Sequence, residues 1–95
     1  MNAWFADFGA RCAETAARHR AVIEAPHLNA AVARELLELT RVVAHGSERQ
    51  FAPLAAFVAG QAIDRMQRSN PALETDDFVT FLQELRQGLE SSGSK

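Results

Sequence analysis

The stretch from Phe51 to Ile63 is apolar on almost every side, and its only polar side chain is Gln61. A helix that is apolar all round is usually buried and does not lie on a surface. In so short a chain we expect this segment, as a helix over residues 53–68, to be the central helix of the domain. The residues expected to be almost fully buried against at least two other helices are Leu54, Phe57, Val58 and Ile63.

Three further segments carry apolar residues at helical spacing, over residues 3–23, 29–45 and 76–89. Their apolar stripes comprise Trp4, Phe5, Phe8, Cys12, Ala16, His19 and Ile23 in the first, Val32, Leu36, Leu39 and Val43 in the second, and Phe78, Phe81, Leu82, Leu85 and Leu89 in the last. Residues 91–95 are rich in serine and glycine and are expected to be disordered. The pattern predicts an all-α fold, a compact four-helix bundle-like single domain over residues 1–90.

Residues with special backbone preferences suggest where the helices begin and end. Asn29 is a suitable N-cap for the second helix, and Gly46 is expected to end that helix in the left-handed conformation. For the third helix, Ala52 as the cap with Pro53 in the first helical position is favoured over a capping box formed by residues 47–50.

Gly60 lies inside the expected third helix, where a glycine costs about 1 kcal/mol relative to alanine. That cost predicts that another backbone packs closely against Gly60, together with Ala56 and Ala59. Replacing Gly60 with leucine is then expected to destabilise the protein by overpacking.

Charge and cysteine content exclude several classes of protein. The formal net charge is −2, with acidic and basic residues interspersed, whereas nucleic-acid binding calls for a basic surface. Cys12 is the only cysteine, so no internal disulfide can form. The N-terminal residues do not resemble a signal peptide, and no apolar run approaches the roughly 20 residues of a membrane span. We therefore expect a cytoplasmic protein that binds neither nucleic acid nor membrane.

No arrangement of residues predicts a catalytic or metal site. The histidines at 19, 27 and 45 lack the spacing that places two ligands on one helical face. Cys12 lies on an apolar face, where a thiol is usually inert, and no glycine-rich phosphate loop is present. His19 lies on the apolar face of the first helix, as a core histidine or, less readily, a buried base or ligand. We expect a protein that is not an enzyme and carries no cofactor and no metal.

His45, Glu48 and Arg49 form the best polar constellation, at the turn that precedes the apolar third helix. Since helix N-termini attract anions, the three side chains could form an anion- or partner-binding corner. Alternatively, Glu48 and Arg49 pair locally and tie the second helix to the third. The local tie is favoured.

The region from Leu36 to Gly60 also resembles a known family. The residues that carry the resemblance are Val43-Ala44-His45-Gly46-x-Glu48-Arg49-x-x-Ala52-Pro53-Leu54-x-x-Phe57-x-x-Gly60. They are similar to a family of small bacterial helical proteins of unknown function, found alone and also beside or fused to the molybdenum-cofactor guanylyltransferase. The resemblance implies a four-helix fold and a link to molybdenum-cofactor maturation, but no reaction and no catalytic residues.

Three hypotheses for function follow. The first is a non-catalytic helical accessory or interaction module, with a protein partner or self-association, that serves molybdenum-cofactor enzymes. The second is a small ligand- or anion-binding protein that uses the corner of His45, Glu48 and Arg49. The third is a structural homodimer. A pocket with convergent polar groups favours the second hypothesis, and a flat exposed apolar patch favours the first or the third.

Overall fold

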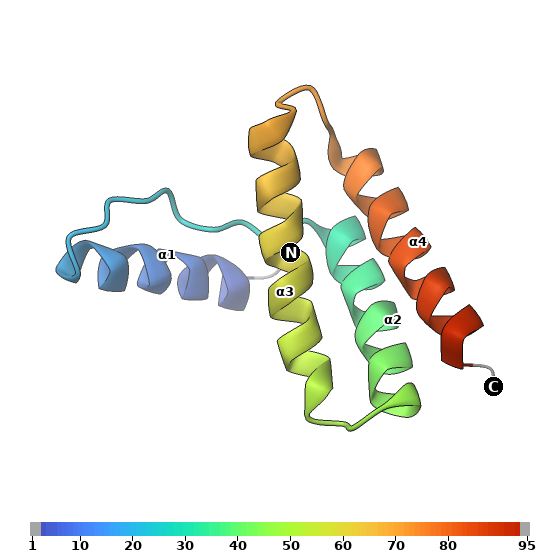
Figure 1. The fold of residues 1–95 in the computed structure, drawn as a ribbon. Coiled ribbons are helices and arrows are strands. Elements are labelled where there is room, and N and C mark those ends of the chain that lie inside the picture. The colour runs from blue at the N-terminus through green and yellow to red at the C-terminus, as the bar shows by residue number, and fades with distance from the viewer. Residues whose placement is uncertain (1–2, 94–95) are drawn as a thin grey trace. The chain divides into compact units, whose positions relative to one another are not determined.

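The computed structural model describes residues 3–93 and contains four helices, which confirms the all-α fold class. These are α1 (Ala3–Arg18), α2 (Ala30–Gly46), α3 (Phe51–Ser69) and α4 (Thr75–Gly93) (Figure 1). The helices belong to two compact units, Met1–Ala30 and Ala31–Lys95, each with its own packing. No helix in the described part of the chain is both long and apolar enough to cross a membrane.

In the first unit, α1 ends at Arg18, five residues before the predicted end at residue 23. The Ala21 N–H donates to the Ala16 carbonyl (2.9 Å), and the Arg20 N–H donates to the Ala17 carbonyl (3.0 Å). These two bonds form a Schellman motif, which requires the left-handed conformation at one residue. That residue is Arg20, with φ of 66°. Glycine usually fills this position, so an arginine here does not indicate that the helix ends.

Gly9 is the one buried residue that α1 contributes. After the Schellman motif, residues 21–29 run without regular secondary structure, and this segment brings Pro26 against Gly9. A β-carbon at Gly9 would overlap the carbonyl oxygen of Pro26. The glycine therefore allows the backbone at Pro26 to lie directly on α1.

The second unit consists of α2, α3 and α4, and its core is small. Leu39 from α2, Ala59 from α3 and Leu82 from α4 form the buried cluster, and Leu82 is completely buried. The partly buried residues that pack around this cluster are Val32, Leu36, Ile63 and Phe81. Residues from the predicted stripes of α2 and α4 therefore do form the centre of this unit.

The prediction that α3 is a buried central helix is wrong. Phe57 is 67% exposed, Leu54 and Val58 are exposed to a similar degree, and only Ile63 packs against the core. Within its unit α3 has two neighbouring helices, so it can bury only one side. That side carries mainly small residues, with Ala59 at its centre. The large apolar side chains of α3 are left facing outward.

The turn between α2 and α3 also differs from the prediction. Gly46 remains helical, and none of the described glycines has a positive φ. Ser47 does not cap α3, because its hydroxyl donates to the Val43 carbonyl at the end of α2 (2.9 Å). The helix begins at Phe51, with Gln50 in the cap position and no side-chain cap bond. Pro53 thus lies in the first turn, where a missing N–H costs no helical bond.

A short loop over residues 70–74 connects α3 to α4. The Asn70 N–H donates to the Met66 carbonyl (2.9 Å), and the Asn70 side chain accepts from the Ala72 N–H (3.2 Å). At the start of α4 the carboxylate of Asp77 accepts from the Glu74 N–H (2.8 Å). These bonds satisfy backbone groups at and beside the helix ends and so hold the loop in place.

The end of α4 lies later than expected. The helix continues to Gly93, although residues 91–95 were expected to be disordered. Residues 94 and 95 lie outside the described part of the chain.

Gly60 does not mediate close helix packing. It is exposed, and a β-carbon added there would meet no atom within 4 Å. The expectation that a leucine at this position would overpack the fold is therefore wrong.

Candidate functional site: an apolar groove between α3 and α4

An open groove of about 560 Å³ runs between α3 and α4, with α2 as its floor. Figure 1 shows α3 and α4 meeting at their connecting loop and diverging away from it. Large apolar side chains and alanines line the groove almost completely: Leu39 and Val43 from α2, Ala55, Val58, Ala59 and Ala62 from α3, and Phe81, Leu85 and Leu89 from α4. The groove lies wholly in the second unit, beside the buried core.

Two features keep the groove open. The α3 wall is built mainly from alanines, whose short side chains cannot reach across to α4. On the α4 wall, Gly88 also lines the groove, and a β-carbon there would meet nothing within 4 Å. As a result Leu85 and Leu89 stay 39% and 44% exposed, although both belong to the predicted core stripe of α4.

Apolar surface continues beyond the groove over the outer side of α3. Leu54 and Phe57 are exposed and lie within one helical turn of Val58, which lines the groove. Large contiguous apolar patches are rare on the surface of soluble monomers, and they often mark interaction sites.

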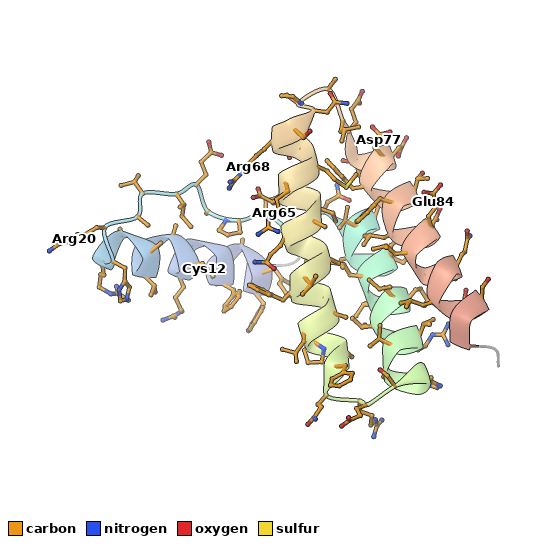
Figure 2. The ribbon with its side chains drawn as sticks, in the orientation of Figure 1. Cys12, Arg20, Arg65, Arg68, Asp77 and Glu84 are labelled. Carbon is orange, nitrogen blue, oxygen red and sulfur yellow. The ribbon has the colours of Figure 1, made fainter. Side chains whose placement is uncertain are left out.

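Among residues 3–93, Glu84 is the only charged residue in the lining of the groove. It lies on α4 (Figure 2), one turn before Gly88, and it is exposed. Within residues 3–93 its side chain makes no ion pair and no hydrogen bond. The groove is thus an apolar surface with a single uncompensated carboxylate at its edge.

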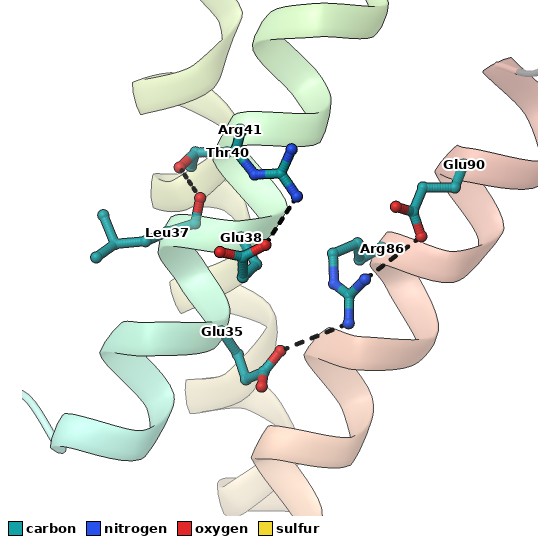
Figure 3. A network of polar contacts seen from close by, with 7 residues as sticks. All are labelled: Glu35, Leu37, Glu38, Thr40, Arg41, Arg86 and Glu90. Atoms are coloured by element: carbon teal, nitrogen blue, oxygen red, sulfur yellow. Dashed lines mark hydrogen bonds and ion pairs between the residues drawn. The ribbon is translucent and has the colours of Figure 1, made fainter.

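A polar network joins α2 to α4 on a different side of α4 (Figure 3). Glu35 accepts a hydrogen bond from the Gln83 amide (3.1 Å) and lies 4.0 Å from the Arg86 guanidinium. Arg86 also pairs with Glu90 on its own helix (3.4 Å). The side chains of Glu35 and Arg86 are only 14% and 23% exposed. This network holds α4 to α2.

Glu38 and Arg41 form an exposed ion pair on α2 beside this network (2.9 Å). The hydrogen bond from Arg41 and its positive charge lower the pKa of the Glu38 carboxyl from its ordinary value. Both side chains are well solvated, so the pair has the character of a surface interaction.

The structure places His45 at the end of α2 and Glu48 and Arg49 in the following turn, all three exposed. The expected Glu48–Arg49 tie does not form: Glu48 accepts from the Gln50 amide (3.2 Å), and no ion pair of Arg49 occurs within residues 3–93. The turn is instead closed by backbone bonds from Phe51 to Glu48 and from Ala52 to Arg49. A binding role for the three residues stays a prediction.

The remaining candidate residues do not assemble a reactive centre. His19 lies just beyond the end of α1 and is exposed, so it is not the core histidine that the apolar pattern indicated. Cys12 is a free, half-buried thiol. Among the described residues, no three His, Cys, Asp or Glu side chains gather closely enough to hold a metal ion.

The sequence pattern does not predict the groove. It places Val58, Leu85 and Leu89 on faces expected to be covered, because helical spacing shows which face is apolar but not whether a neighbour covers it. One signal was present: α3 has large apolar residues on more sides than two neighbouring helices can cover.

Fold and site together define the class: a small all-α domain with an exposed apolar groove. The chain belongs to the family described as Domain of unknown function (DUF6457), whose model matches residues 3–93. No curated protein matches the chain. No solved structure matches it either.

Proposed function

We propose that this protein is a non-catalytic helical interaction module, which binds an apolar segment of a partner protein in the groove between α3 and α4. The observation that carries the proposal is the open groove itself, lined by apolar side chains from three helices. Val58, Leu85 and Leu89 are left with large exposed fractions that no packing in their own unit covers.

The energetics favour an apolar ligand. Burying a leucine or phenylalanine side chain contributes about 1.5–3 kcal/mol through the hydrophobic effect. Two or three such side chains seated in the groove therefore offset a large part of the entropy lost on association. A polar metabolite has little to bind, since Glu84 is the only charged group that the described residues contribute to the lining.

Two glycines offer a matched pair of variants for the test. Gly88 and Gly60 are both helical, and a β-carbon at either position meets nothing within 4 Å. Only Gly88 lines the groove. Gly88→Leu places a large side chain in the groove, whereas Gly60→Leu places the same side chain on α3 outside the groove lining. Each change removes a helical glycine, so both variants are expected to be at least as stable as the parent.

The experiment uses the tagged protein to capture partners from its native host, followed by mass spectrometry and reconstitution with the purified candidate. Titration calorimetry then gives the Kd for the parent and both variants. The proposal predicts that Gly88→Leu weakens binding at least tenfold and that Gly60→Leu leaves it within twofold, that is, within about 0.4 kcal/mol. Equal binding by all three proteins contradicts a role for the groove.

The link to molybdenum-cofactor maturation is a separate, finer proposal, and the resemblance over Val43 to Gly60 supports it. A purified molybdenum-cofactor guanylyltransferase is the partner with which to test it. If that enzyme does not bind the parent protein at micromolar concentrations, the link is refuted and the groove proposal is unaffected. Cytoplasmic location, self-association and the absence of catalysis likewise remain predictions.

A further inference from the structure

We infer that the groove binds an amphipathic helix that carries a lysine or arginine opposite Glu84. The inference rests on the proposed function and specifies the chemistry of the partner. It draws on three features of the groove: the backbone that lines it, its length, and its single charge.

The described helices around the groove leave no backbone groups free for a ligand. A ligand must therefore pair its own backbone N–H and C=O groups with one another. All three walls are helices, whose N–H and C=O groups are already paired within each helix. A peptide that bound in extended form would bury unpaired backbone groups against apolar side chains, and each such group costs free energy. A helical ligand pairs its own backbone groups, so only side chains need to match the lining.

The dimensions also suit a helix. The lining residues extend from Ala55 to Ala62 on α3 and from Phe81 to Leu89 on α4. At 1.5 Å per residue these stretches span roughly 10–12 Å, or about two helical turns. A ligand helix would therefore place large apolar residues at positions i, i+4 and i+7 into the groove. Gly88 leaves room on the α4 wall for the bulkiest of them.

Glu84 determines which amphipathic helix is favoured. Its carboxylate is exposed at the groove, and the nearest cation in its helix, Arg86, is engaged with Glu35 and Glu90. An approaching helix with a basic residue beside its apolar face gains a charge pair there. A second copy of this protein docked groove to groove would instead bring two Glu84 carboxylates together, and a fatty acid would bring its own carboxylate. Charge complementarity thus favours a basic partner helix over both.

Three stapled helical peptides serve as probes. They share leucines at i, i+4 and i+7, and they differ only in the flanking residue, which is lysine, glutamine or glutamate. Fluorescence polarisation measures the Kd of each peptide for the parent protein, Glu84→Gln, Glu84→Lys and Gly88→Leu. Asp76→Lys is the matched control, because Asp76 is exposed on the same helix but does not line the groove.

For the parent protein and for Asp76→Lys, the lysine peptide is expected to bind about two- to fivefold more tightly than the glutamine peptide, and the glutamate peptide more weakly than either. This range is typical of a solvent-exposed ion pair. Glu84→Gln removes the preference and Glu84→Lys reverses it. The preference shrinks at high salt, because counterions screen the pair.

Other outcomes overturn the inference in distinguishable ways. In one outcome the peptides bind without any charge preference, and Gly88→Leu abolishes that binding. This outcome refutes the basic partner but is consistent with the proposed function. Failure of all three peptides to bind refutes a helical ligand, and the capture experiment then decides the proposed function separately. Analytical ultracentrifugation could instead show that the parent dimerises reversibly and that Gly88→Leu abolishes the dimer. The occupant of the groove is then a second copy of the protein, and the basic partner helix is refuted.

Discussion

The carbonyl oxygen of Pro26 lies where a side chain at Gly9 would have to stand, so the segment after α1 rests directly on the helix backbone. This contact joins two positions of the first unit that are far apart along the chain. It also shows that Gly9 is a position in that unit where a side chain does not fit.

Gly9→Ala is therefore expected to destabilise the contact between α1 and residues 21–29. Alanine is the better helix former by about 1 kcal/mol, but the Pro26 carbonyl must move away, and overpacking typically costs about 1–3 kcal/mol. NMR should show weaker nuclear Overhauser contacts between residue 9 and Pro26 in the variant than in the parent. Unchanged contacts and an unchanged free energy of unfolding would show that this segment does not rest on Gly9 in solution.

Gly60 is expected to behave in the opposite way. Because a β-carbon there meets nothing within 4 Å, Gly60→Ala should raise the free energy of unfolding by about 0.5–1 kcal/mol through helix propensity. Urea denaturation of the parent and the variant measures the difference. A loss of stability would instead support the close backbone packing that the sequence pattern predicts at this position.

The contrast between these two glycines shows what apolar spacing in the sequence can and cannot predict. The existence of four helices followed from apolar spacing, and Leu39, Phe78 and Leu82, placed on the predicted stripes, are buried. Close packing was assigned to the wrong glycine, because a helix pattern does not reveal which turn a distant segment approaches. Residues 21–29, which make the actual contact with Gly9, had been placed partly inside the first helix.

The groove cannot be predicted from the sequence, for a related reason. Leu85 and Leu89 have the spacing of core residues, yet they remain partly exposed because α3 and α4 diverge from their connecting loop (Figure 1). That divergence depends on how three helices pack together, and no local pattern encodes it. Val58 and Phe57 were likewise identified correctly as apolar helix residues and placed wrongly in the interior.

Arg20 offers a direct test of the Schellman motif that ends α1. Its left-handed backbone, with φ of 66°, is unfavourable for any residue with a β-carbon, by roughly 1–2 kcal/mol. Arg20→Gly removes this strain at some cost in unfolded-state entropy, so a net gain of about 0.5–1 kcal/mol is expected in thermal or urea unfolding. Arg20→Ala keeps the strain and serves as the control. Equal stability of the glycine and alanine variants would contradict the left-handed assignment.

The Glu38–Arg41 pair predicts a specific pH response. The hydrogen bond and the charge of Arg41 lower the folded-state pKa of Glu38 below 4.5, so the carboxylate favours folding at a pH above its unfolded pKa. This contribution is lost as the pH falls through the lowered folded pKa. An NMR titration of the parent should show the low pKa, and Arg41→Gln should bring it back towards its ordinary value. An unchanged Glu38 titration in the variant would rule out the ion pair in solution.

Glu35 and Arg86 hold α4 to α2 in a setting that is largely shielded from water. Glu35→Ala removes the acceptor for Gln83 and one of the two carboxylates beside Arg86. We expect a loss of about 1–3 kcal/mol in the free energy of unfolding, because a buried polar group is left without its partner. Two atoms of this pair, Glu35 Oε1 and Arg86 Nε, already lack a hydrogen-bond partner among the described residues.

The double replacement of Glu35 and Arg86 by leucine should therefore be far less harmful than either single replacement. Apolar side chains of similar size can substitute for a desolvated ion pair with little loss and sometimes with a gain. A double-mutant cycle from urea unfolding measures the coupling, and the exposed Glu38–Arg41 pair serves as the control with little coupling expected. If the two single losses simply add, Glu35 and Arg86 are not energetically coupled, and the ion pair between them contributes nothing to stability beyond the other contacts of each residue.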